Sequence, residues 1–274
     1  MAVLITVDDP HDQRLDAFRW RERQLASKPQ RAEKVGAGLF VAEGDLVVHR
    51  ALATQHTPVA LLCSSRHAAS LATQLPDSVT VFEAPSDVRR DVTGLGVPLE
   101  VTGLFQRPAL VDPHDLITRS RYIVVLEAID NPTNVGAIVR SAVALGWDGV
   151  LLDATSADPL ARRALRVSMG TALSLPFARV SPEQSLQILL RDNNVTTIAL
   201  TPSETAADIS DIHCAVNTQR AIMLGSERDG LSKDLLSLAT HTVRIPMHNN
   251  IDSLNVSVAA SIAMYALGPS ASRI

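Results

Sequence analysis

Short runs of apolar residues alternate with helical patterns along most of this chain of 274 residues. Between residues 39 and 107 the strand-type runs FVAEG, VALLCS, VTVFEA and LEVTGLFQ alternate with helix-type stretches such as RHAASLATQL. Apolar runs of about four to eight residues are typical of buried strands, and apolar positions with a period near 3.6 are typical of helices. The pattern therefore predicts a small α/β sandwich that ends near Arg107.

A second series of the same kind begins at Arg121, with strand-type runs YIVVLEAI, GVLLD, FARV, TTIALT, AIMLGS and VRIPM between helix-type stretches. Strands that are apolar throughout are typical of a parallel sheet covered on both faces. Ligands of such sheets bind beyond the carboxyl ends of the strands. The intervening stretch RPALVDPHDLITRS has two prolines and mixed charge, which is typical of a linker. We therefore predict a first domain at 1–107, a linker at 108–120 and a second domain at 121–274.

Composition narrows the class of protein. The chain is 46% hydrophobic with a formal net charge of −4, which excludes binding of nucleic acid by bulk positive charge and leaves only a local basic patch. Cys63 and Cys214 have neither zinc-type spacing nor a disulfide framework, so we expect a reducing cytoplasm and no metal. The first residues lack the basic region of a signal peptide, and the longest apolar run is too short to span a bilayer.

Three strand exits in the second domain are more polar than a turn requires. In the first, IDNPTNVGAIVR, Asn134 lies at the start of a helix, where an asparagine can also serve simply as an N-cap. Arg140 is the only charged residue in the apolar stretch 135–145. Helical side chains lean toward the N-terminus, which predicts that Arg140 points back toward the Asn134 loop. The alternative is that Arg140 extends to the solvent, as isolated arginines commonly do.

The second exit is IMLGSERDGLS, in which Gly225 permits a close approach of the backbone and Glu227 stands at the mouth of the loop. The alternative for Glu227 alone is a solvated carboxylate. The third exit, IPMHNNIDSLN, leads into the last helix, and we expect Ser253 to cap that helix and Asn255 to lie in its first turn. Together the three exits predict one polar site at the carboxyl edge of the sheet.

These residues also resemble a known family. N-P-T-N-V-G-A-I-V-R, L-G-S-E-R-D-G-L and the I-P-M to S-L-N-V-S-V-A-A stretch are similar, in this order, to the three motifs of the SpoU/TrmH branch of SPOUT RNA methyltransferases. LRVSMGTALSLPF resembles the family segment between the first two motifs. The resemblance covers about residues 121–267. In the first domain, FVAEG with Glu43 and Gly44 is similar to a substrate-binding domain often fused to this branch, which itself resembles kink-turn-binding ribosomal proteins.

The resemblance implies a fold, a cofactor and an activity. The fold is a parallel sheet whose C-terminal part forms a deep trefoil knot, and the enzyme is a cytoplasmic homodimer. The small residues of the last helix, Ser257, Ala260, Ser261 and Ala263, would then pack against a partner helix. The activity is transfer of a methyl group from S-adenosylmethionine to a ribose 2′-hydroxyl in ribosomal or transfer RNA, with ribosomal RNA the more expected of the two. The residues implied to bind the cofactor are Thr201, Leu224, Gly225, Ile245, Met247 and Leu254.

The residues implied to be catalytic are Arg140, Asn134, Glu227, Ser253 and Asn255. In the family an arginine at the position of Arg140 is proposed to activate the hydroxyl group. Because arginine is a poor base, we expect Arg140 instead to bind the neighbouring phosphate and to stabilise charge developing on the oxygen. Asn134 would orient Arg140 or the ribose, Glu227 would fix its loop or an arginine, and Ser253 and Asn255 would position the cofactor and the RNA.

Basic residues cluster near the N-terminus. Residues 14–34 contain seven Lys or Arg against three acidic residues. An amphipathic helix with ion pairs on its solvated face is the alternative to an RNA contact. The resemblance favours RNA, because an acidic protein needs a local basic surface to bind it. Trp20 is the one aromatic candidate for base stacking in a chain that is 3% aromatic. The expected RNA-binding residues are Arg14, Arg19, Arg21, Arg23 and Arg166.

Two other classes of protein compete with the enzyme. A non-catalytic RNA-binding protein that kept the fold is one, and the complete set of expected catalytic residues argues against it. A nucleotide-dependent dehydrogenase is the other, and no G-x-G-x-x-G follows any predicted strand. Within the enzyme class the target can be ribosomal RNA, transfer RNA or a drug-binding site on RNA, because the catalytic motifs are common to all three.

Overall fold

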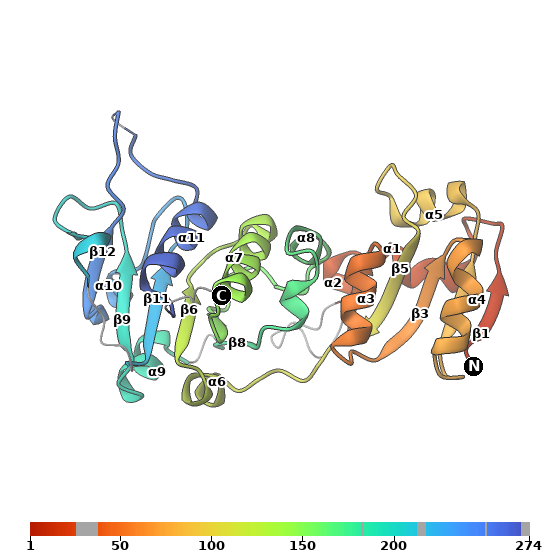
Figure 1. Ribbon diagram of the computed structural model, residues 1–274, viewed down its shortest axis with the longest axis horizontal. Coiled ribbons are helices and arrows are strands. Elements are labelled where there is room, and N and C mark those ends of the chain that lie inside the picture. The colour runs from red at the N-terminus through yellow and green to blue at the C-terminus, as the bar shows by residue number, and fades with distance from the viewer. Residues whose placement is uncertain (26–37, 182–183, 213–217, 250, 270–274) are drawn as a thin grey trace. The chain divides into compact units, whose positions relative to one another are not determined.

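The computed structural model describes residues 1–25, 38–181, 184–212, 218–249 and 251–269. The chain forms two compact units (Figure 1). The first contains Met1–Ala109 together with Leu160–Leu173, and the second contains Leu110–Pro159 together with Ser174–Ile274. Within the described ranges, no helix combines the length and the apolar character needed to cross a membrane.

The first unit is built on a five-stranded sheet with the order β1-β4-β3-β5-β2. Strands β1, β4 and β3 run parallel, whereas β5 is antiparallel to both β3 and β2. Helices α1 and α5 contribute Phe18, Val88 and Val92 to one core cluster with Leu62 and Phe82 of the sheet. The strands are β1 (Val3–Thr6), β2 (Leu39–Glu43), β3 (Pro58–Cys63), β4 (Thr80–Glu83) and β5 (Val101–Gln106). The helices are α1 (Asp16–Arg19), α2 (Glu22–Leu25), α3 (Asp45–Ala53), α4 (Ser65–Gln74) and α5 (Ser86–Thr93), with a 3-10 helix η1 (Gln13–Leu15).

The N-terminal segment differs from the prediction in two respects. The first residues form β1, an edge strand paired with β4, although the predicted series of strands began only at residue 39. The basic segment is not one continuous helix, because Trp20 adopts an extended conformation, with ψ of 139°, between α1 and α2. Residues 26–37, the remainder of the predicted basic helix, lie outside the described residues.

The second unit contains a seven-stranded sheet with the order β10-β12-β9-β11-β6-β7-β8, and every neighbouring pair is parallel (Figure 1). This confirms the predicted α/β fold with a parallel sheet. The strands are β6 (Tyr122–Leu126), β7 (Gly149–Leu152), β8 (Phe177–Arg179), β9 (Thr196–Leu200), β10 (Ala207–Asp208), β11 (Arg220–Leu224) and β12 (His241–Arg244). The short edge strand β10 was not predicted, since two residues leave no periodic pattern in a sequence.

Helices cover both faces of this sheet. One face carries α6 (Pro113–Arg119), α9 (Leu186–Asp192) and α10 (Lys233–Leu238), whose Leu116, Leu190 and Leu235 join the core cluster with Val125 and Met223. On the other face, α7 (Pro132–Ala144) and α11 (Val256–Leu267) pack against each other, and α11 also contacts β11. A short 3-10 helix, η4 (Ile209–Asp211), follows β10.

The segment predicted as a linker contains helix α6. Asp112 caps it by accepting hydrogen bonds from the backbone N–H groups of His114 and Asp115, and Pro113 occupies the first turn, where its missing N–H costs nothing. Leu116 and Ile117 are buried in the core of the second unit. Pro113, one of the two prolines that suggested a linker, therefore starts a helix instead.

A second departure concerns residues 160–173, which lie between β7 and β8 in the sequence but belong to the first unit. They form α8 (Arg162–Val167) and a 3-10 helix η3 (Thr171–Leu173). The contacts of α8 with β2 account for this grouping, which no local sequence pattern indicates. The predicted second domain, 121–274, took this segment as its own.

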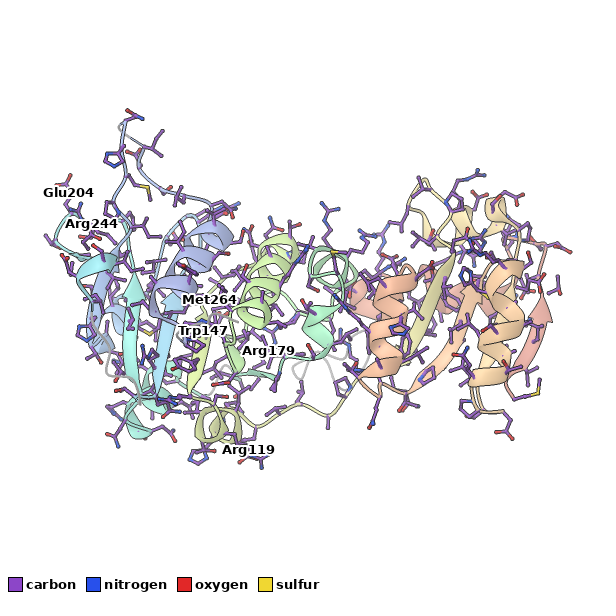
Figure 2. All side chains as sticks on the ribbon, viewed as in Figure 1. Arg119, Trp147, Arg179, Glu204, Arg244 and Met264 are labelled. Carbon is purple, nitrogen blue, oxygen red and sulfur yellow. The ribbon has the colours of Figure 1, made fainter. Side chains whose placement is uncertain are left out.

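The last helix packs closely against α7 of the same chain. Ala260 and Ala263 are 0% and 1% exposed, and the hydroxyl groups of Ser141 and Ser261 lie 2.8 Å apart across the two helices. Small residues allow this close approach, as expected, but their partner is α7 and not a helix of a second chain. At the far end of α11, Trp147 Nε1 donates a hydrogen bond to the Met264 carbonyl oxygen at 3.1 Å (Figure 2). Gly268 is the C-cap of the helix.

Candidate functional site

Three residues from distant parts of the chain form one hydrogen-bonded cluster at the carboxyl edge of the second sheet. Asn134 Nδ2 donates to Glu227 Oε1 at 2.9 Å. Asn255 Nδ2 donates to the same Glu227 oxygen at 2.9 Å and to Asn134 Oδ1 at 3.1 Å. Asn134 is 6% exposed, whereas Glu227 and Asn255 face the solvent. One oxygen of Glu227 thus accepts hydrogen bonds from the side-chain amides of both asparagines. Each of the three predicted motifs supplies one residue of this cluster.

The start of α7 explains why Asn134 is available for this cluster. Asn131, not Asn134, is the N-cap, since its side chain accepts from the Thr133 backbone N–H at 2.9 Å. Pro132 occupies the first helical position, which favours this start. Asn134 therefore lies within the first turn, and its amide points to Glu227 instead of the helix backbone.

The loop after β11 presents Glu227 through a tight backbone crossing. A Cβ atom at Gly225 would lie 2.1 Å from the Gly230 carbonyl carbon and 2.2 Å from the Leu231 nitrogen. Ser226 and Gly230 form a β-bridge, and Gly230 has φ of +68°. Gly225 therefore lies close to the backbone of Gly230 and Leu231 in the same loop, which is the close approach that was predicted for it. Glu227 lies at the exposed tip of this loop.

The start of α11 corrects the predicted cap. Asn255 is the N-cap, and its Oδ1 accepts from the Ser257 backbone N–H at 2.9 Å and from the Ser257 hydroxyl at 2.6 Å. Ser253 lies two residues earlier and is exposed. Asn255 can both cap the helix and join the cluster because its oxygen faces the helix while its nitrogen donates to Asn134 and Glu227.

The loops that follow β9, β11 and β12 leave the sheet side by side, because β9 lies between β11 and β12. The Thr201 backbone N–H donates to the Val243 carbonyl oxygen at 2.9 Å, which joins the ends of β9 and β12. Leu224 is buried at the end of β11. The other residues expected to bind the cofactor are half-buried: Thr201, Gly225, Ile245 and Met247 lie just after these strand ends, and Leu254 lies next to the start of α11.

Arg140 is on the exposed side of α7. It follows Asn134 by six residues, about 9 Å along the helix axis at 1.5 Å per residue. A six-residue step also turns the side chain about 120° away from that of Asn134. Arg140 is therefore exposed to the solvent, which agrees with the alternative prediction.

The basic residues expected to bind RNA are partly neutralised by acidic neighbours. Arg14 pairs with Asp12 and Arg19 with Asp16, at 2.5 and 3.0 Å. Hydrogen bonds from Arg14 lower the pKa of Asp12 to about 2. Arg21 is exposed, and the side chain of Arg23 lies outside the described residues. Arg166 pairs with Glu43 of the first unit.

Sequence reasoning missed a polar cavity of about 230 Å³ on the sheet face covered by α9 and α10. Glu127, Asp153 and Asp234 contribute carboxylates to its lining. Glu127 Oε2 accepts from the Ser232 backbone N–H at 2.7 Å. Burial opposes ionisation of Asp153, but hydrogen bonds from Ser156, Thr155 and the Ala128 N–H outweigh it and lower the pKa of Asp153. The sequence indicates this cavity only by an acidic residue directly after each of two strands, as in VVLE and VLLD.

Among the described residues, one group has the composition of a metal site, the exposed Asp112, His114 and Asp115. The Asp112 carboxylate already caps α6. In this group the Asp112 carboxylate therefore stabilises the start of α6.

Comparison with known proteins agrees with the motifs. Residues 121–265 match the model of the SpoU rRNA methylase family. An uncharacterized tRNA/rRNA methyltransferase of Mycobacterium tuberculosis strain H37Rv is 36% identical over 262 residues, which cover 94% of this chain and 90% of the relative.

Solved structures agree on the fold. An AdoMet-bound rRNA methyltransferase from Sinorhizobium meliloti superposes with a TM-score of 0.81 at 24% identity, over 96% of this chain and 97% of its own. The SpoU methyltransferase AviRb from Streptomyces viridochromogenes, in complex with AdoMet, gives a TM-score of 0.77 at 24% identity, over 93% and 97% of the two chains.

Proposed function

Because the chain belongs to the SpoU rRNA methylase family, we propose that it transfers a methyl group from S-adenosylmethionine to a ribose 2′-hydroxyl of RNA. The observation that carries this proposal is the cluster of Asn134, Glu227 and Asn255, which unites the three family motifs. The family description and the Sinorhizobium meliloti structure both name ribosomal RNA, which favours it over transfer RNA as the substrate.

The strand-end loops fit S-adenosylmethionine in their chemistry. Thr201, Leu224, Gly225, Ile245, Met247 and Leu254 offer apolar surface and backbone polar groups and no charged side chain. Such a set suits the adenine ring and the aliphatic chain of S-adenosylmethionine, which are bound by apolar contacts and backbone hydrogen bonds. The bound cofactor would supply an electrophilic methyl group. The threaded backbone of the family, a deep trefoil knot, would bring these loops together.

The chain's own residues would position the RNA and stabilise charge. The two amides and Glu227 brace each other, so Asn134 can hold the ribose in one orientation. We assign Arg140 to the phosphate next to the target ribose, where its exposure permits contact with RNA. Its positive charge would stabilise the developing negative charge of the 2′-oxygen. Arginine side chains stay protonated in proteins, so the proton leaves to a phosphate oxygen or to water.

A homodimer is supported by an exposed apolar stripe on α11. Val258, Ile262 and Tyr265 are 47%, 37% and 77% exposed, and their spacing of four and three residues places them on one helix face. Exposed apolar stripes of this kind are typical of protein interfaces. We propose that α11 contacts a second copy of the chain through this face, which lies opposite the buried Ala260 and Ala263.

The decisive experiment incubates the purified protein with labelled S-adenosylmethionine and total unmodified RNA, and counts the label in each size fraction. We expect label in the ribosomal RNA fraction, reduced by about 100-fold or more in Arg140→Ala, since lost positioning and charge stabilisation each have effects of that size.

Two other outcomes have distinct meanings. Label in the transfer RNA fraction would keep the enzyme and change its substrate. Neither label nor binding of S-adenosylmethionine would reject the enzyme and leave a non-catalytic RNA-binding protein, the alternative function for this fold.

A further inference from the structure

One buried carboxylate in the first unit holds a segment that belongs, by sequence, to the methyltransferase half. Residues 160–173 leave the second unit after β7, add α8 and η3 to the first unit, and return before β8. The chain therefore passes between the two units three times, after residues 109, 159 and 173. A single linker, which the sequence predicted, would make one passage.

Glu43, the last residue of β2, is the centre of this attachment. Its side chain is 0% exposed. Arg162 Nε donates to Glu43 Oε1 at 2.8 Å, and Arg162 Nη2 bonds the same oxygen. Arg166 Nη1 bonds the other oxygen, Oε2. The two arginines are four residues apart, so they lie on one face of α8 and hold a single carboxylate between them.

Further contacts fix the position of α8. Arg162 also donates to the Phe18 and Thr93 carbonyl oxygens, at 3.3 and 3.4 Å. The Arg162 backbone N–H donates to Glu22 Oε1 at 2.7 Å, which supplies the acceptor that the N-cap residue, an alanine, lacks. Arg50 binds the Met169 carbonyl oxygen at the end of the helix. A buried charge held by this many directional bonds specifies one register for the helix.

We propose that Glu43 is a positioning residue for RNA methylation: it anchors segment 160–173 in the first unit through Arg162 and Arg166. This role rests on the proposed function. Arg162 and Arg166 are then structural anchors, and Arg166 does not bind RNA phosphate as the sequence suggested. Loss of the anchor disturbs RNA methylation and spares cofactor binding, because the loops expected to bind the cofactor all belong to the second unit.

The anchor is tested first without any substrate, by hydrogen–deuterium exchange on the full-length protein. Glu43→Gln removes the charge and keeps the shape of the side chain. We expect the amides of residues 162–170 to exchange about tenfold faster or more, because charge-assisted hydrogen bonds are roughly twice as strong as neutral ones. Glu83→Gln is the matched control, since Glu83 ends β4 at the same edge of the same sheet. Unchanged exchange in Glu43→Gln would overturn the proposal.

The second test measures methylation kinetics together with cofactor affinity. In Glu43→Gln we expect kcat/KM for RNA to fall between about 10- and 100-fold, the effect of a displacement near 1 Å. The Kd for S-adenosylmethionine should stay within about twofold of the wild type. Wild-type kinetics in Glu43→Gln would contradict the positioning role. A wild-type protein that neither binds S-adenosylmethionine nor methylates RNA would instead reject the proposed function, and the exchange result would still decide the anchor.

Arg166→Gln separates the anchor from an RNA contact and guards against misfolding of the Glu43 variant. The side chain of Arg166 is 30% exposed, and Glu43 keeps Arg162 in this variant. An anchor predicts faster exchange of α8 without RNA and an unchanged salt dependence of RNA binding. A phosphate ligand predicts the reverse, with the slope of log K against log salt reduced by about one. The second pattern would overturn our assignment of Arg166.

Discussion

At the scale of single residues, the geometry of the candidate site depends on side chains that serve two purposes at once. Asn255 caps α11 with its oxygen and joins the cluster with its nitrogen. Glu227 Oε1 accepts from two amides, which leaves its other oxygen outside this pair of bonds. Gly225 lets the loop after β11 cross itself and so presents Glu227. Each of these positions tolerates few replacements for a reason that can be measured.

Gly225→Ala should destabilise the second unit by about 1–3 kcal/mol, because the new Cβ would overlap backbone atoms that cannot move independently. Urea-induced unfolding followed by circular dichroism measures the change. Gly230→Asn is the control in the same loop: Gly230 has positive φ and open space around it, and asparagine tolerates this conformation. We expect the control to stay within about 0.5 kcal/mol of the wild type. Equal effects of the two variants would contradict the close approach.

Asp153→Asn should reduce stability at neutral pH by about 1–3 kcal/mol, because an amide replaces one of the two accepting oxygens. The pKa of Asp153 is lowered in the folded protein, so its contribution is present above the ordinary value of 3.8 and is lost as pH falls through the lowered pKa. The difference between wild type and variant should therefore be constant from about pH 5 to 8 and shrink below about pH 4. Unfolding curves over this range test it, with exposed Asp130→Asn as the control.

At the scale of elements, α11 is held at both ends by polar contacts. Asn255 caps its N-terminus, and two donors bind the carbonyl groups that its last turn leaves unpaired. Trp147 Nε1 donates to the Met264 oxygen at 3.1 Å, and buried Arg220 donates to the Leu267 oxygen at 3.0 Å. Arg220 also lies over the Tyr122 ring, 5.2 Å from its centroid. The helix that supplies Asn255 to the site thus has a fixed axial position.

Trp147→Phe should destabilise the protein by about 1–3 kcal/mol, since the buried Met264 oxygen loses its donor. Hydrogen exchange should increase in the last turn of α11 and remain unchanged in α3 of the first unit. Trp20→Phe is the matched control, because Trp20 is half-buried and the chain has only these two tryptophans. Increased exchange in the last turn of α11 with Trp20→Phe would show that the effect does not come from the lost hydrogen bond.

At the scale of the whole molecule, the two units carry different chemistry. The second unit holds the candidate cluster and the strand-end loops, and the first holds the basic N-terminal segment and Glu43. The basic residues Arg14 and Arg19 are paired with aspartates, so an RNA phosphate would compete with these carboxylates for the two arginines. The exposed stripe on α11 belongs to the second unit, which places the proposed dimer contact on the catalytic half.

Ile262→Glu should convert the proposed dimer to a monomer, because burying a carboxylate in an apolar contact costs several kcal/mol. Sedimentation velocity measures the mass directly. Val97→Glu is the control, since Val97 is 59% exposed on the first unit and away from α11 in the sequence. A wild-type protein that sediments as a monomer at micromolar concentration would contradict the dimer.

The sequence by itself determined the central strands and the family. The runs IVVL, IAL and AIML are apolar at every position, which is typical of strands buried on both faces, and they lie in β6, β9 and β11. The motifs lie at the strand ends, where a parallel sheet binds ligands, so the set Asn134, Glu227 and Asn255 could be named from the sequence. Local periodicity and short motifs depend on near neighbours in the chain, and a sequence displays these directly.

Only the tertiary structure decided which residues cap the helices and which segments belong to each unit. Asn131 caps α7 and Asn255 caps α11, although Asn134 and Ser253 were chemically suitable, because the cap is fixed by backbone angles that the packed helices impose. Segment 160–173 joined the first unit because Glu43, 119 residues from Arg162, binds its arginines. The segment predicted as a linker forms α6, because Leu116 and Ile117 are buried in the core of the second unit. Each of these choices depends on a contact between residues far apart in the chain, which no local pattern records.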